Sequence, residues 1–158
     1  MFPNLTDNDR WRIKSPFDKR YNCIAWAAGD ITRRWWPTIF PPVGAPPDYW
    51  PVEREETVEC FVRAFATLGY MPCESGDYEF GYQKVAIYAD SDLTPTHMAR
   101  QSFWGGWLSK LGDYHDIFHP RLVDVEGDTS PEAGQYGIVV KFIKRSWWSA
   151  IRHRVHAA

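Results

Sequence analysis

The stretch KVAIYADSDLTPTHMARQSFWGGWLSKLG, residues 84–112, contains three short segments rich in β-branched and aromatic residues. The turn-forming sequences DSDLTP and WGG separate them. Connections this short join neighbouring antiparallel strands. The stretch therefore predicts antiparallel strands at residues 84–90, 96–103 and 106–112, and the segment 136–145 adds a fourth.

Two helices are expected before these strands. The stretch 54–70 has Glu55 and Glu56 near its start, carries apolar residues on one face and has Gly69 near its end, which predicts an amphipathic helix. A shorter helix is expected from Asn22 or Cys23 to Ala28. Asparagine is a common N-cap residue, and Gly29 is a good terminator. Helices followed by strands indicate an α+β domain with N-terminal helices packed on an antiparallel sheet.

The remaining segments are expected to surround this core. Residues 37–51 contain six prolines, which exclude a regular helix and disfavour a central strand. Their flanking tryptophans and tyrosines predict an ordered excursion. Residues 1–19 are expected to form an N-terminal arm and residues 146–158 a C-terminal tail, around a core at about 20–145. A chain of 158 residues is long enough for one domain, so we expect one domain over its whole length.

Composition excludes several classes of protein. The formal net charge is -2, and basic residues gather only in the C-terminal stretch KFIKRSWWSAIRHRVHAA, so no nucleic-acid partner is expected. The three cysteines are irregularly spaced, which argues against a disulfide framework and a CxxC zinc site. No cofactor is implied. Without a signal peptide or membrane span, no membrane partner is expected, and the protein is expected in the cytoplasm or as cargo of a specialised secretion system.

Cys23 and His97 are the candidate catalytic pair. Cys23 is the cysteine placed at a predicted helix start, where unpaired amides favour the thiolate. His97 begins a predicted strand, which would hold its imidazole rigidly as the base. The alternative is that Cys23 fills the core and that His97 is a half-buried histidine bonded to backbone.

A third catalytic group is expected near the strand that follows His97. If 96–103 and 106–112 form a hairpin, His97 comes opposite residues 112–114, just before Asp116. Asp116 is therefore the leading candidate for the group that orients His97. The alternative is that Asp116 is a solvated acid in a loop. Its rivals are Asp113, His115, His119 and Ser109. The histidines and acids of residues 113–119 have metal-ligand types, but Gly112 and Pro120 argue against a helix there, and no metal site is predicted.

Asn22, Trp26 and Lys110 are the candidate oxyanion- and substrate-binding residues. The Asn22 amide could donate to an oxyanion, or it could simply cap the helix. Lys110 would share one side of the hairpin with Arg100 and could hold an acidic group of a substrate, or be plain surface charge. Trp26 would lie on the apolar side of the nucleophile's helix.

The order of these parts resembles a known superfamily. The phrases YNCIAWA, KVAIYAD, PTHMARQ and GWLSKLG are similar to the papain-like cysteine hydrolases in their compact NlpC/P60-like form, and still more to a group of bacterial proteins without a settled function. The resemblance covers residues 20–145 and implies a papain-like fold with Cys23 as nucleophile and His97 as base. NlpC/P60 enzymes often place the catalytic histidine where this chain has Lys84, so the histidine would have to come from the next strand.

Two functions follow as hypotheses. The first is a cysteine hydrolase or acyltransferase, a protease, amidase or deamidase that attacks an amide bond of a peptide or protein through a thioacyl intermediate. The second is a catalytically inactive papain-like binding module that uses a tryptophan-rich surface. Nine tryptophans are many for this length, and the sequences RRWW and SWW are hard to bury completely.

Overall fold

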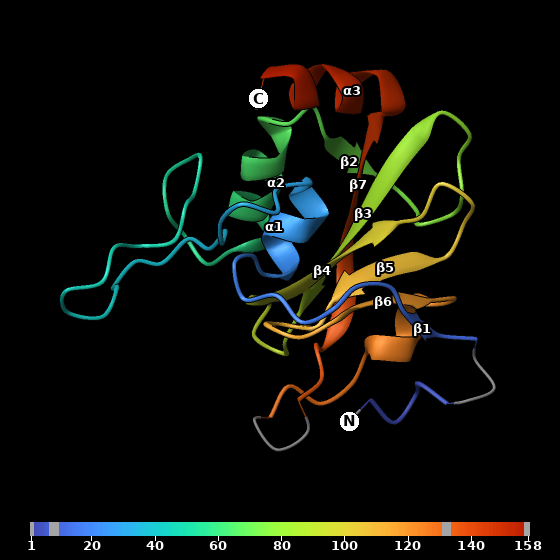
Figure 1. The fold of residues 1–158 in the computed structure, drawn as a ribbon, viewed down its shortest axis with the longest axis horizontal. Coiled ribbons are helices and arrows are strands. Elements are labelled where there is room, and N and C mark those ends of the chain that lie inside the picture. Colours follow the sequence, from blue (N-terminus) through green and yellow to red (C-terminus); the bar gives the residue numbers. More distant parts are fainter. Residues whose placement is uncertain (1, 7–9, 131–133, 157–158) are drawn as a thin grey trace.

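Seven antiparallel strands form one sheet, in the order β1-β6-β5-β4-β3-β7-β2 (Figure 1). The computed structural model describes residues 2–6, 10–130 and 134–156. Its strands are β1 (Arg12–Ile13), β2 (Met71–Cys73), β3 (Tyr82–Ala89), β4 (Pro95–Gln101), β5 (Trp107–Lys110), β6 (Asp116–His119) and β7 (Ile138–Ser146). Its helices are α1 (Cys23–Ala28), α2 (Val58–Ala66) and α3 (Trp147–His156), and residues Leu122–Val125 form a 3-10 turn, η2.

The α+β class with an antiparallel sheet is confirmed, and so are the four predicted strands, with shifted ends. The placement of the helices is corrected. β1 precedes α1, and α3 follows β7, so the helices are not grouped at the N-terminus. One region expected to be irregular also joins the sheet: residues 12–13 of the N-terminal arm form β1, which pairs with β6 at one edge.

α1 is fixed by its two ends. The Asn22 side chain accepts from the Ala25 amide at 3.1 Å, and Gly29 closes the helix with a φ of 84°. That left-handed conformation is one that glycine adopts without strain. The short helix is almost wholly buried and packs on β4 and β5.

α2 begins later than expected. Thr57 caps it by accepting from the Cys60 amide at 3.2 Å, so residues 54–57 lie before the helix. The side chain of Arg54 does not take part in the helix and donates to backbone carbonyls of the proline-rich segment and its flanks. On its inner face α2 buries Phe61 and Phe65.

The sheet is covered on both faces. One core lies under α1 and α2 and includes Ile24, Phe61, Val85, Met98 and Ile143. The second lies on the opposite face, under the N-terminal segment, η2 and Tyr136, and includes Ala86, Tyr88, Ala99, Trp107 and Ile117. Each central strand therefore contributes alternate residues to two different cores.

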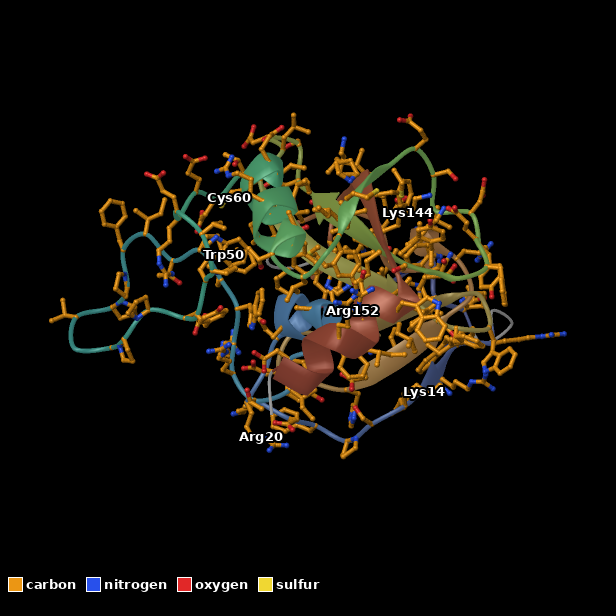
Figure 2. The ribbon with its side chains drawn as sticks, turned by 90° about the horizontal axis from the view of Figure 1, so that it is seen from above. Lys14, Arg20, Trp50, Cys60, Lys144 and Arg152 are labelled. Carbon is orange, nitrogen blue, oxygen red and sulfur yellow. The ribbon has the colours of Figure 1, made fainter. Side chains whose placement is uncertain are left out.

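The proline-rich segment forms an arm that leaves the body of the domain (Figure 1). At its base the Trp36 amide donates to the Tyr49 carbonyl, and Arg54 donates to the carbonyls of Trp36, Thr38 and Asp48. Below the base, Trp50 donates to the sulfur of Cys60 at 3.3 Å; the two lie beside one another in Figure 2. The ordered excursion predicted for residues 37–51 is confirmed.

Candidate functional site

Cys23 is the first residue of α1 and lies in the core. Its side chain is 7% exposed and belongs to the same cluster as Met98 of β4. Burial raises the pKa of the thiol to about 11, and nearby backbone amides offset only part of this. Because the thiolate is the nucleophile in thiol chemistry, Cys23 is held in its unreactive form at neutral pH.

His97 lies on β4 and points away from α1. It is paired across the strands with Tyr88, and the ring of Tyr136 stacks on the imidazole at 3.9 Å. The next residue, Met98, belongs to the same core as Cys23. Neighbouring residues of a strand point to opposite faces, so Cys23 and His97 lie on opposite sides of the sheet. The structure does not bring the expected nucleophile and base together.

His97 instead belongs to a buried chain of hydrogen bonds with Ser109 and His119. The Ser109 hydroxyl lies 2.9 Å from His97 Nε2 and 2.8 Å from His119 Nε2, and His119 Nδ1 lies 2.8 Å from the carbonyl of Arg121. Burial lowers the pKa of both imidazoles, which are therefore neutral.

The direction of each of these hydrogen bonds follows from the last acceptor, the carbonyl of Arg121. A carbonyl only accepts, so His119 carries its proton on Nδ1, and its Nε2 accepts from the Ser109 hydroxyl. Ser109 then accepts from His97 Nε2–H. The remaining nitrogen, His97 Nδ1, is buried and has no hydrogen-bond partner in the described part of the chain.

Asp116 and Lys110 face the α1 side of the sheet and are opposite one another on β6 and β5. Asp116 accepts from the hydroxyls of Ser15 and Tyr21. β6 is separated from β4 by β5, and Asp116 lies on the other face from His97. The expected orientation of His97 by Asp116 is therefore absent, because residues 116–119 form β6, whose register with β5 places Asp116 opposite Lys110.

The candidate binding residues have structural partners. Lys110 is fully buried and donates to the Tyr114 carbonyl at 2.6 Å. Asn22 donates to the Trp35 carbonyl at 2.8 Å in addition to capping α1, so its amide is not available to an oxyanion. Trp26 stacks on Tyr21 and lies under the Arg100 guanidinium, 4.4 Å from its carbon. Arg100 and Lys110 do share one face of the sheet, as expected, but that face is covered by α1.

A cleft of about 510 Å³ lies at the base of the arm. It is lined by Arg33, Arg34, Pro46, Pro47, Asp48, Tyr49, Trp50 and Arg54. Arg33 forms an ion pair with Asp30, and Arg34 forms ion pairs with Asp48 and Asp113. This cleft does not reach Cys23 or His97.

Three aromatic side chains meet where the β4–β5 turn contacts α3: Phe103, Trp104 and Trp147. We call these three, together with the next residue of α3, Trp148, the aromatic surface. The ring of Phe103 lies 4.8 Å from Trp104 and 5.4 Å from Trp147. Trp104 is 89% exposed and Trp148 74% exposed. The sequence SWW had suggested such exposure, whereas the β4–β5 turn was not singled out.

The turn that carries Trp104 has a defined shape. Gly105 and Gly106 have φ values of 89° and 69°. A side chain at position 106 would also clash with the Phe118 ring, 2.5 Å from where its Cβ would lie. The Ser102 amide donates to the Gly106 carbonyl at 2.9 Å, which closes the turn. Trp104 is thus presented to solvent on a rigid support.

Residues 12–144 match the family described as "Domain of unknown function (DUF7689)". The chain belongs to this family. No curated protein and no solved structure is found to match it.

The DUF7689 match begins at β1 and ends within β7. It includes the arm, Cys23, His97 and Trp104, and it stops before Trp147 and Trp148. Among the described residues, no helix combines the length and apolar character needed to cross a bilayer.

Proposed function

We propose that this DUF7689 domain is a non-catalytic binding module that recognises a peptide or protein through its aromatic surface. The observation that carries the proposal is Trp104, a large apolar side chain that is almost fully exposed on a rigid turn. Large exposed aromatic side chains lower the solubility of a protein, and a cluster of them on its surface marks an interaction site.

The chemistry of the surface fits a protein partner. Neither segment that forms it, residues 101–107 or 146–151, contains a charged residue. Tryptophan anchors dominate the binding energy of many protein interfaces, because they bury much apolar area and lose little side-chain entropy.

The arrangement of the cysteine supports binding over catalysis. Cys23 is buried with a raised pKa, and the His97 ring is on the far side of the sheet. A hydrolase would need a thiolate within hydrogen-bond reach of its base. The papain-like order of elements would then be a scaffold without its catalytic pair.

A selection from a random peptide library displayed on phage tests the proposal. We expect enriched peptides that bind the wild-type chain and bind the double variant Trp104→Ser, Trp148→Ser at least about tenfold more weakly. Tyr114→Ser is the matched control, because Tyr114 is an exposed aromatic residue on a different turn. Peptides that bind the double variant as well as the wild type contradict the proposed surface.

A further inference from the structure

The arm carries apolar side chains that nothing in the described chain covers. Residues 37–47, PTIFPPVGAPP, contain no charge. Phe40 is 90% exposed, Val43 is fully exposed and Ile39 is half exposed. Figures 1 and 2 show the arm extending away from the sheet and helices.

The arm is held in place despite this exposure. Trp35 and Tyr49 form a bridge at its base, and Arg54 ties the carbonyls on both sides of it. Proline fixes the φ angle, so the proline-rich part loses little conformational freedom when it binds. An uncharged, preorganised segment with exposed apolar residues has the properties of a docking element.

Proline-rich extended segments dock on surfaces lined by aromatic side chains. This chain carries both halves of such a contact: the arm and the aromatic surface. We propose that the arm of one copy docks on the aromatic surface of a second copy, and that two such reciprocal contacts form a dimer. The inference rests on the proposed function, because it names the partner of that same surface.

The arrangement of the two elements allows a closed dimer. In Figure 1 the arm leaves one side of the domain, and the turn that joins β4 to β5 lies at the other. A two-fold axis perpendicular to the direction that joins these two sides makes the copies antiparallel, so that the arm of each copy lies on the same side as the other copy's aromatic surface. Such a reciprocal contact closes without leaving an unpaired surface.

The area that two such contacts would bury overlaps the range of specific interfaces. Each contact would cover Phe40 of one copy and Trp104 and Trp148 of the other. Large aromatic side chains bury roughly 150–250 Å² each, so two contacts bury roughly 900–1,500 Å² from these groups alone. A specific interface needs about 1,200–2,000 Å², and the prolines of the arm add to the total.

Analytical ultracentrifugation of the full chain tests the inference. We expect a monomer–dimer equilibrium for the wild type. The arm variant Phe40→Ser, Val43→Ser and the surface variant Trp104→Ser, Trp148→Ser are each expected to dimerise at least about tenfold more weakly. All four side chains are exposed, and circular dichroism checks that both variants remain folded. Tyr114→Ser is the control and should dimerise like the wild type.

Mixing the two variants identifies the contact. The arm variant keeps its aromatic surface and the surface variant keeps its arm, so a mixture restores one of the two contacts. We expect the mixture to associate more strongly than either variant alone. A wild type that stays monomeric up to millimolar concentration overturns the inference, and so does a mixture that associates no better than its components.

The two proposals can fail separately. A monomeric chain whose library-selected peptides still require Trp104 and Trp148 retains the proposed function and excludes the second copy as partner. A dimer that is insensitive to both double variants excludes the proposed contact.

Discussion

Cys23 shares a core with Met98, the residue that follows His97 on β4, and so lies across the sheet from the His97 imidazole. A contact between the two side chains would require β4 to shift by one residue, which would exchange its two faces. The register of β4 with β3 fixes Tyr88 opposite His97, and both cores depend on it. The separation is therefore built into the sheet.

We expect Cys23 to be unreactive toward iodoacetamide near neutral pH. Cys73 is the least buried of the three cysteines and should be labelled first, whereas Cys23 and Cys60 are buried. Mass spectrometry after timed labelling gives the three rates, and Cys73→Ser provides the control. Because His97 lies on the other face of the sheet from the thiol, His97→Gln should leave the Cys23 rate unchanged. Rapid labelling of Cys23 that requires His97 would favour a hydrolase.

Much of the fold was predictable because its signals are local. The predicted α1 follows from Asn22 and Gly29, which act at its ends in the structure as their residue types indicate. β6 was not predicted, because DIFH is four residues long and follows a stretch of polar loop residues. Its strand character comes from pairing with β5 and β1 rather than from its own sequence.

The face to which each side chain of β4 points determines whether His97 can meet Cys23, and the sequence does not reveal that face. His97, Met98 and Ala99 are all fully buried, because the strand is covered on both faces. A strand of this kind lacks the alternation of polar and apolar residues that shows which side chains share a face. The prediction that a strand would hold the His97 ring rigidly is compatible with its hydrogen bond to Ser109. The face of the sheet on which the ring lies depends on how the strand packs in the folded protein.

We expect the folded state to lose stability as the pH falls below about 6.5, the ordinary pKa of an unfolded histidine. Burial lowers the pKa of His97 and His119 in the folded state. Below pH 6.5 the unfolded chain therefore binds protons that the folded chain does not, and the stability that is fully present above that pH declines. The slope is up to about 1.4 kcal/mol per pH unit for each imidazole. Urea unfolding across this range measures it, and His97→Gln should reduce the slope by about one proton; an unchanged slope would show that His97 does not titrate on unfolding.

We expect Asn22→Ala to lower the free energy of unfolding by about 2–3 kcal/mol. The change removes the cap on the Ala25 amide and both bonds to the backbone of Trp35, all in a buried place. Asn22→Asp keeps the accepting oxygen and loses the donor, so it should cost less. Denaturant unfolding compares the three chains. Equal stability of Asn22→Ala and wild type would mean that the cap contributes nothing.

We expect Arg54→Ala to loosen the base of the arm while leaving the body of the domain folded. Arg54 donates to the carbonyls of Trp36, Thr38 and Asp48, which lie on both sides of the arm. Hydrogen bonds from a charged donor contribute about 1.5–3 kcal/mol, so amide exchange at Trp36 and Tyr49 should accelerate by at least about tenfold.

Hydrogen exchange measured by mass spectrometry or NMR distinguishes this local effect from global unfolding, because amides of β3 and β4 should keep their wild-type rates. Arg63→Ala is the matched control, since Arg63 forms an exposed ion pair with Glu55, the kind of pair that contributes little to stability. The same loosening should weaken self-association, because a disordered arm loses more conformational entropy on docking. Unchanged exchange at Trp36 and Tyr49 in Arg54→Ala would show that the backbone bridge and the prolines hold the arm without the guanidinium.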